Sequence, residues 1–228
     1  MAVEETRSGE DCEMPLVIVI PVKGGASAKS RLGGDEAFRA ALARAMALDT
    51  IEAALAVAPV IVVTGPELAA DAAALGATVV PDPGMGLNPA IEAGLGLVST
   101  GSTHSVGETR STGSTGSTHS AGATSAVLLG DLPGLDPREL RAALAAAKNE
   151  RNFVADADGV GTVLTVARAS HALRFGPHSR EAHTSEGYVE LLEPWPSLRR
   201  DVDLPQHLVA LKRGARTLEL LRTREGER

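Results

Sequence analysis

The sequence predicts an α/β protein built on a single doubly wound, mostly parallel sheet. Apolar, β-branched runs alternate along the chain with helix-length segments that carry capping signals, the pattern of parallel strands joined by crossover helices. The first run, residues 16–20, is continuously apolar, as expected of a strand buried on both faces. At 228 residues, the chain is long enough for one large domain with a substantial core.

The predicted elements follow one another in strand–helix order. Strands are expected at 16–20, 60–64, 77–80, 126–129, 153–155 and 162–167, and helices at 35–55, 66–75, 87–98, from 136 onward and at 205–212. Asp35 is the expected N-cap of the first helix, Gly76 ends the second, and Asp136 followed by Pro137 opens the fourth. Open parallel sheets bind ligands at the carboxyl ends of their strands, so function is expected just after 16–20 and 126–129.

Some segments do not fit this alternation. Residues 1–14 are predicted to be a disordered leader, 15–222 the domain, and 223–228 a tail. From 99 to 125 the chain is almost entirely Ser, Thr, Gly and His, which cannot bury an apolar face, so we expect a flexible loop inserted in the domain. Metal binding by His104 and His119 is the weaker interpretation of this loop.

Composition and charge exclude several classes of partner. The net charge of -7 argues against nucleic acid, whose phosphates are bound by excess Lys and Arg. Aromatic residues make up only 2%, so the core must be aliphatic, and the one cysteine, Cys12, permits no disulfide within the chain. No apolar run approaches the roughly 20 residues that span a bilayer, and the acidic start lacks a signal-peptide pattern. The prediction is a cytoplasmic protein with no membrane partner.

The segment after the first strand has the composition of a phosphate-binding loop. It contains glycines that permit close backbone approach, and it brings Lys23, Lys29 and Arg31 within nine residues. It is not a Walker A loop, because the Gly-Lys-Ser/Thr ending and its spacing are absent. A solvated turn is the alternative interpretation.

Three aspartates are candidates for a metal site. Asp131 follows a predicted buried strand, and Asp201 and Asp203 alternate, so on an extended segment both point to one face. Magnesium is typically held by one or two carboxylates together with phosphate oxygens and water, so we predict Mg²⁺ on Asp131 and Asp201. The alternatives are a turn cap for Asp131 and a helix N-cap for Asp203, which fits capping better than metal binding.

Two turn-rich segments, 156–162 and 174–179, could bind a small anion or be plain turns. With the loop and the aspartates, they resemble in order the guanylyltransferases of deazaflavin coenzyme F-420 biosynthesis, which act on 2-phospho-L-lactate or phosphoenolpyruvate. The matching stretches are Val22-Lys23, Ala28-Lys-Ser-Arg-Leu32, Leu87-Asn88, Gly130-Asp-Leu-Pro133, Gly161-Thr162, Arg174-Phe-Gly-Pro177 with Ser179, and Asp201-Val-Asp203. The Gly-Asp-Leu-Pro element marks only the wider superfamily, which includes molybdenum-cofactor and sugar-phosphate nucleotidyltransferases; the Arg-Phe-Gly-Pro-x-Ser stretch marks the narrow family. The chain departs from this pattern at Gly24-Gly25, at Leu204 and in the length of the 99–125 segment.

The resemblance implies a Rossmann-like nucleotidyltransferase fold and a reaction of GTP with phosphoenolpyruvate. The products would be enolpyruvoyl-2-diphospho-5'-guanosine and pyrophosphate, the former passing to a transferase of the same pathway. The implied sites are Thr162, Gly176 and Ser179 for the acceptor, Lys23, Lys29 and Arg31 for the GTP phosphates, Asn88 for the nucleoside, Asp131 and Asp201 for Mg²⁺, and Lys23, Lys29 and Asp131 for catalysis. Three alternatives stay open: 2-phospho-L-lactate as acceptor, giving lactyl-2-diphospho-5'-guanosine; a molybdenum-cofactor-type nucleotidyltransferase; and a non-catalytic nucleotide-binding module. The oligomeric state is also open, a homo-oligomer included.

Such a reaction needs no general base. A phosphate monoester has a second pKa near ~6 and is already ionised at neutral pH. The chain shows no evident His/Asp or Cys/His pair, and His171, His178 and His183 are interpreted as surface or turn residues. The protein has to supply positioning and charge neutralisation, which the lysines, the arginine and Mg²⁺ provide.

Overall fold

The computed structural model describes residues 16–23, 32–99 and 124–226. Its strands are β1 (Val17–Pro21), β2 (Val60–Thr64), β3 (Thr78–Pro81), β4 (Ser125–Leu128), β5 (Arg151–Ala155), β6 (Thr162–Ala167) and β7 (Val189–Glu190). Its helices are α1 (Glu36–Leu55), α2 (Pro66–Ala74), α3 (Leu87–Ser99), α4 (Pro137–Ala146), α5 (Ser179–Ser185), α6 (Pro196–Arg199), α7 (Pro205–Val209) and α8 (Ala215–Gly226). Strands and helices alternate from β1 to α4, as predicted.

All seven strands form one sheet in the order β3-β2-β1-β4-β6-β5-β7. The neighbouring pairs are parallel except those of β6, which runs antiparallel to both β4 and β5. The carboxyl ends of β1, β4 and β5 therefore lie at the same edge of the sheet as the beginning of β6. The predicted fold class, a mostly parallel doubly wound sheet, is confirmed.

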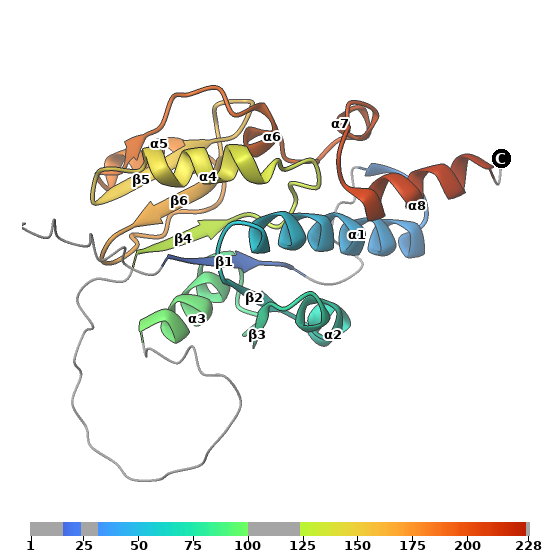
Figure 1. Ribbon diagram of the computed structural model, residues 1–228, viewed down its shortest axis with the longest axis horizontal. Coiled ribbons are helices and arrows are strands. Elements are labelled where there is room, and N and C mark those ends of the chain that lie inside the picture. Colours follow the sequence, from blue (N-terminus) through green and yellow to red (C-terminus); the bar gives the residue numbers. More distant parts are fainter. Residues whose placement is uncertain (1–15, 24–31, 100–123, 227–228) are drawn as a thin grey trace, which may run out of the picture.

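Helices cover both faces of the sheet, with α1, α2 and α4 on one side and α3 on the other (Figure 1). Successive strand residues point to opposite faces, which is why β1, covered on both faces, is apolar at every position. Ile18 and Ile20 of β1 pack in the cluster beneath α1, α2 and α4, whereas Val17 and Val19 pack in the cluster beneath α3. These two clusters are largely aliphatic, as the composition predicted, and a smaller cluster contains the aromatic residues Phe153 and Tyr188.

The predicted caps are present. Asp35 accepts a hydrogen bond from the Phe38 N–H at 2.8 Å, and Asp136 accepts one from the Arg138 N–H at 2.9 Å. Gly76, with φ +99, follows the end of α2. Each charged cap satisfies an amide that the helix itself cannot satisfy.

Other boundaries differ from the prediction. The helix expected at 205–212 ends at Val209, and α8 continues to Gly226, beyond the predicted end of the domain at 222. The elements β7, α5, α6 and α8 were not predicted. The predicted leader and nearly all of the 99–125 loop, with His104 and His119, lie outside the described residues; α3 ends at one side of that loop and β4 begins at the other.

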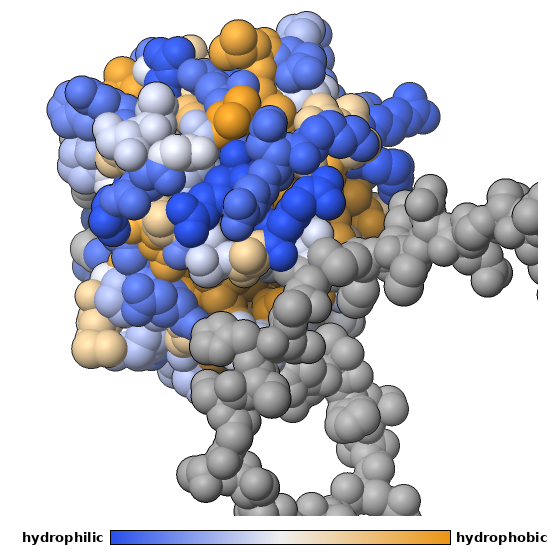
Figure 2. Space-filling model, turned by 90° about the vertical axis from the view of Figure 1, so that its left-hand side faces the viewer, coloured by the Kyte–Doolittle hydropathy of each residue, from blue (hydrophilic) through white to orange (hydrophobic). Residues whose placement is uncertain are grey.

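The surface is polar with isolated apolar side chains. Hydrophilic residues cover most of the face in Figure 2, and hydrophobic residues are visible between them. The large apolar side chains that are exposed within the described residues come from four stretches of the chain: Met85 and Leu87, Val160, Val189 and Leu192, and Val209. Within the three described ranges, no helix is both long and apolar enough to cross a membrane.

Candidate active site

The loop after β4 packs directly onto the end of β1. A Cβ on Gly130 would lie 3.3 Å from the Pro21 carbonyl oxygen and 2.9 Å from the Val22 side chain, so the glycine permits this close approach. Lys23 follows at once and is exposed, and Asp131 follows Gly130. The structure thus brings the predicted loop lysine and the predicted metal ligand to one edge of the sheet. Lys29 and Arg31 lie outside the described residues.

Three carboxylates meet at this edge. One carboxylate oxygen from each of Asp131, Asp201 and Asp203 lies within 4.8 Å of the other two. The two segments are joined by a hydrogen bond from the Val202 N–H to the Asp131 carbonyl, 3.1 Å long. The N-cap of α7 is Leu204, so the interpretation of Asp203 as the helix cap is wrong, and its carboxylate instead belongs to the acidic cluster.

A histidine that sequence analysis missed lies behind this cluster. The Nδ1 atom of His207 lies 3.0 Å from the Asp201 carbonyl oxygen and 3.4 Å from the Asp203 N–H nitrogen. One ring nitrogen therefore contacts the backbone on both sides of Val202. The position of His207 in the first turn of α7, four residues after Asp203, is the signal that could have indicated the contact.

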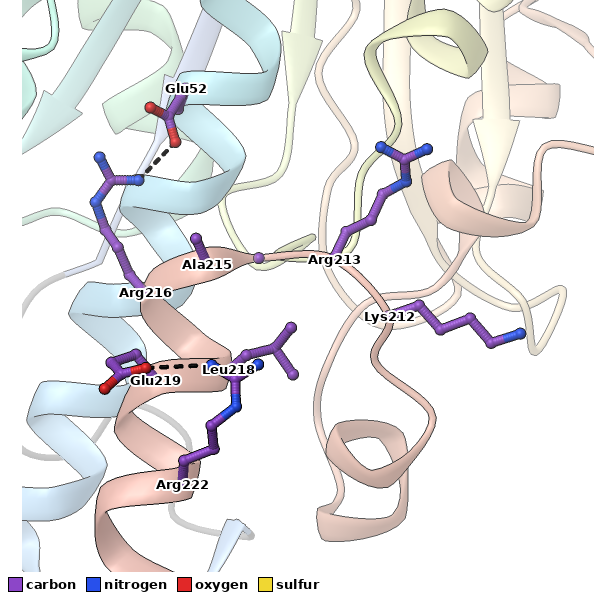
Figure 3. Close-up of a pocket in the computed structure, with 9 residues that line it drawn as sticks. Glu52, Lys212, Arg213, Ala215, Arg216, Leu218, Glu219 and Arg222 are labelled. Atoms are coloured by element: carbon purple, nitrogen blue, oxygen red, sulfur yellow. Dashed lines mark hydrogen bonds and ion pairs between the residues drawn. The ribbon is translucent and has the colours of Figure 1, made fainter.

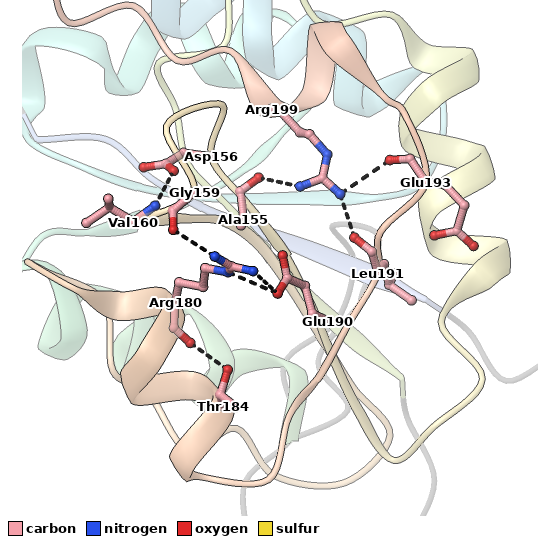
Figure 4. Close-up of polar contacts among 10 residues, drawn as sticks. All are labelled: Ala155, Asp156, Gly159, Val160, Arg180, Thr184, Glu190, Leu191, Glu193 and Arg199. Atoms are coloured by element: carbon pink, nitrogen blue, oxygen red, sulfur yellow. Dashed lines mark hydrogen bonds and ion pairs between the residues drawn. The ribbon is translucent and has the colours of Figure 1, made fainter.

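The segment that carries Asp201 is also joined to the turn after β5. The Ala157 N–H donates to the Arg199 carbonyl at 2.8 Å, and the Arg199 guanidinium donates to the Ala155 carbonyl at 3.0 Å (Figure 4). Within the turn, the Asp156 carboxylate accepts the Val160 N–H at 2.9 Å and the Gly161 N–H at 2.7 Å. Both amides are thus paired within the turn. Of the two interpretations of 156–162, a small-anion site or a plain turn, these contacts agree with the turn.

The three predicted acceptor residues come together beside this turn. Thr162 begins β6 and is 3% exposed, and Ser179 begins α5 and is 2% exposed. Gly176, with φ +139, accepts a hydrogen bond from the Ser179 N–H at 3.2 Å through its carbonyl. Arg180 ties α5 to the turn, because its backbone N–H donates to the Val160 carbonyl at 3.1 Å. The 174–179 segment and the start of β6 therefore form one local structure.

His183 lies in the middle of that structure and is fully buried, so its interpretation as a surface or turn residue is wrong. Its Nδ1 atom lies 3.0 Å from Thr162 Oγ1, and its Nε2 atom lies 3.2 Å from the Arg174 backbone nitrogen. The ring packs edge-on against Phe175 and Tyr188, with centroids 5.0 and 5.1 Å away. Burial lowers the pKa of His183 from 6.5 to about 4, and a hydrogen bond with the Ser179 backbone acts in the opposite direction.

The other two histidines interpreted as surface or turn residues, His171 and His178, have surroundings that differ from those of His183. His178 is exposed and adopts φ 58, in agreement with the turn interpretation. His171 is half-buried, and its ring lies 3.1 Å from Ser125 Oγ and 3.2 Å from Thr165 Oγ1, so the surface interpretation is wrong for it. Burial lowers the pKa of His171 to about 4 as well. Ser125 begins β4, so His171 lies at the opposite end of that strand from the acidic cluster.

Asn88, the predicted nucleoside contact, makes two contacts to the acceptor segment. Its Nδ2 donates to the Phe175 carbonyl and its Oδ1 accepts the Phe175 N–H, both at 3.1 Å. This pair joins the first turn of α3 to the 174–179 segment. Its role toward the nucleoside stays a prediction.

A cationic groove lies elsewhere, between α8, the loop before it and α1 (Figure 3). It measures about 820 Å³, and its lining includes Lys212, Arg213, Arg216 and Arg222. None of the described site residues predicted from the sequence lines it. Arg216 forms an ion pair with Glu52 at 2.7 Å, and Arg213 forms one with Asp136 at 2.7 Å, so part of this charge is already neutralised.

Solved structures of other proteins share this fold. A protein from Desulfovibrio desulfuricans assigned as a nucleotide-diphospho-sugar transferase matches with a TM-score of 0.65 and 15% identity, over 92% of this chain and 95% of that one. A 4-diphosphocytidyl-2C-methyl-D-erythritol synthase matches with a TM-score of 0.52 and 15% identity, over 87% of this chain and 97% of that one. At this identity the likeness shows the fold alone, which is the Rossmann-like nucleotidyltransferase fold.

Sequence comparison then narrows the class. The family model of the MobA-like NTP transferase domain matches residues 23–222. Phosphoenolpyruvate guanylyltransferase of Thermomonospora curvata is 45% identical over 96% of this chain and 93% of its own length. The protein of the same name from Salinispora arenicola is 41% identical over 90% of this chain and 93% of its own length. The chain belongs to the MobA-like NTP transferase family and, within it, to the group of the phosphoenolpyruvate guanylyltransferases, as its sequence motifs indicated.

Proposed function

We propose that this chain transfers the guanylyl group of GTP to phosphoenolpyruvate, giving enolpyruvoyl-2-diphospho-5'-guanosine and pyrophosphate in coenzyme F-420 biosynthesis. The observation that carries this proposal is the 45% identity, over 96% of the chain, to a protein named for this reaction. The geometry supports it, because a lysine, three carboxylates and two buried hydroxyl side chains from distant parts of the sequence occur along one edge of the sheet.

In this reaction an oxygen of the acceptor phosphate attacks the α-phosphorus of GTP. A new phosphorus–oxygen bond forms, the bond between the α-phosphorus and the bridging oxygen to the β-phosphorus breaks, and pyrophosphate leaves with the electron pair. The acceptor oxygen is already ionised, so no side chain has to remove a proton. Thr162, Gly176 and Ser179 hold the phosphate and carboxylate of the acceptor, while Lys23, with Lys29 and Arg31, faces the phosphates of GTP. Asn88 is the proposed nucleoside contact.

The acidic cluster fits magnesium by the chemistry of its donors. Three carboxylates supply hard, anionic oxygen atoms, which Mg²⁺ prefers to nitrogen or sulfur. Asp131 and Asp201 would hold the ion, with Asp203 in reach of the same position. When bound, the ion supplies neutralisation of phosphate charge.

The test is an assay of pyrophosphate release by the purified chain, with mass spectrometry of the product. GTP, ATP and CTP are each combined with phosphoenolpyruvate or 2-phospho-L-lactate, with Mg²⁺ or with chelator. We expect turnover only with GTP, phosphoenolpyruvate and Mg²⁺. Turnover restricted to 2-phospho-L-lactate, to another nucleotide, or absent despite GTP binding would refute the proposal.

The role of Asp131 is tested by Asp131→Asn, which removes the charge and keeps the shape. We expect turnover to fall by about 10²-fold or more while the unfolding midpoint stays close to that of the parent. The matched control is Asp71→Asn, because Asp71 of α2 is paired with Arg44 away from the cluster and its loss should leave turnover unchanged. Near-normal turnover of Asp131→Asn would remove this residue from the site.

A further inference from the structure

Three of the four polar backbone groups of residues 174–175 are held by side chains from other elements. The Arg174 N–H donates to His183 Nε2 on α5, at 3.2 Å. The Phe175 N–H and carbonyl are both paired with the amide of Asn88 on α3, at 3.1 Å each. The segment immediately precedes Gly176, so its conformation sets the direction of the Gly176 backbone.

The hydrogen bonds of His183 determine its tautomer. Nε2 has to carry a lone pair, because its partner, the Arg174 backbone nitrogen, can only donate. The proton of the neutral ring is therefore on Nδ1, where Thr162 Oγ1, 3.0 Å away, and the Ser179 backbone carbonyl are its acceptors. The hydroxyl proton of Thr162 must then point away from the ring.

The surroundings of the ring favour this neutral, fixed state. His183 is fully buried among Phe153, Phe175 and Tyr188, whose rings give it no room to turn over. Two charged groups act on the pKa of His183 in opposite directions: Arg174 lowers it and Glu186 raises it. Burial has the largest effect and lowers this pKa to about 4. At neutral pH the ring therefore carries one proton and no charge.

We propose that His183, in its Nδ1–H form, is a positioning residue of the acceptor site, and that Asn88 acts with it to hold the 174–176 backbone. This inference rests on the proposed function, since it assumes that Thr162, Gly176 and Ser179 bind the acceptor. His183 contacts the first of these directly and sits one helical turn after the third. One side chain thus fixes, at the same time, the start of β6, the segment before Gly176 and the start of α5.

The kinetic test uses His183→Phe, which keeps an aromatic ring and removes the hydrogen bonds to Thr162, Arg174 and Ser179. We expect the KM for phosphoenolpyruvate to rise roughly tenfold or more while the KM for GTP changes less than about twofold. His183→Gln can still offer an acceptor to the Arg174 N–H, and it should recover part of the loss. Because Asn88 is also the proposed nucleoside contact, Asn88→Ala should raise the KM for phosphoenolpyruvate together with the KM for GTP. A rise in the KM for GTP alone would show that Asn88 contacts only the nucleoside and would overturn its part of the proposal.

The matched control is His171→Phe, the same exchange at the other histidine of lowered pKa, at the far end of β4. It should lower the unfolding midpoint as His183→Phe does, yet leave both KM values unchanged. If the two variants alter the kinetics alike, or if His183→Phe affects both substrates equally, His183 is a structural residue only and the inference is wrong.

A second measurement does not depend on turnover. Nitrogen-15 NMR of labelled histidine in the unmodified protein reports which ring nitrogen carries the proton, and we expect Nδ1–H for His183 at neutral pH. An Nε2–H tautomer or a charged ring would overturn the inference even in an active enzyme. If instead the protein turns over neither acceptor, the proposed function fails while the tautomer result still stands, so the two failures are distinguishable.

Discussion

Asp49 should be one of the most important residues for stability, and Asp49→Ala tests this. The carboxylate is 5% exposed on α1 and accepts four hydrogen bonds from the first turn of α8. The donors are the Thr217 N–H at 2.9 Å, the Thr217 hydroxyl at 2.7 Å, the Arg216 N–H at 3.1 Å and the Arg216 guanidinium at 3.3 Å. An anion at a helix N-terminus is favourable, because the amides there lack partners in the helix.

The magnitude follows from the groups that the substitution leaves without an acceptor. Thr217 is fully buried, so its N–H and hydroxyl each lose a partner that water cannot replace, at about 1–3 kcal/mol each. Arg216 keeps its ion pair with Glu52, so it adds little. Summed, the free energy of unfolding should fall by about 2–6 kcal/mol, which for a domain of this size lowers the melting temperature by on the order of 10 °C.

The assay is urea denaturation and calorimetry of Asp49→Ala beside Glu52→Gln. Glu52 is the other partner of Arg216, but its side chain is 58% exposed, so breaking that pair should cost under about 1 kcal/mol. A loss for Asp49→Ala that is no larger than the loss for Glu52→Gln would refute the reasoning that burial makes the difference.

Three further predictions concern the backbone, pH and the acceptor. Gly214→Ala should destabilise more than Gly76→Ala, because both have positive φ (+95 and +99) but only at Gly214 would the Cβ meet other atoms, 2.6 Å from the Pro133 carbonyl oxygen; equal unfolding midpoints would contradict this. Burial lowers the pKa of His171 and His183 to about 4, so their contribution to stability is complete above about 6.5 and is lost as the pH falls toward 4; the unfolding midpoint should fall over that range, and less steeply in His171→Gln. Ser179→Ala should raise the KM for phosphoenolpyruvate and leave the KM for GTP nearly unchanged, and equal increases for both would contradict the division of the site.

The fold was predictable where local signals were strong. Continuous β-branched runs marked β1 and β2, and the caps at Asp35 and Asp136 marked the starts of α1 and α4. The sequence patterns did not predict α5 and α8, because the positions of these helices depend on contacts with residues far away in the sequence. Asp49 lies 168 residues before Thr217, and a hydrogen bond over that separation leaves no periodic pattern near either residue.

The candidate site was predictable where a residue follows a strand. Asp131 and Lys23 follow β4 and β1, and parallel topology places those strand ends at one edge. Thr162 begins β6 and reaches the same edge because β6 runs antiparallel to β4, a reversal that the sequence did not predict. The burial of His183 was not predictable, because a histidine in a short polar segment has the same composition whether it is solvated or buried; for His207, the four-residue spacing from Asp203 was the available signal. Only the fold shows that Phe175 and Tyr188 enclose His183.

The reversed direction of β6 has a consequence for how this protein family can diversify. Because β6 starts at the edge where β4 ends, the residues proposed to bind the nucleotide all precede residue 136, and those proposed to bind the acceptor fall between 155 and 185. The residues proposed to bind the two substrates thus come from successive stretches of the sequence. Asp201 and Asp203 are the exception, because they follow the acceptor stretch and join Asp131 at the acidic cluster. An exchange of the acceptor stretch at the loop after α4 would therefore have to preserve the pairing of Asn88 with the Phe175 backbone and the pairing of β4 with β6, which join the two stretches.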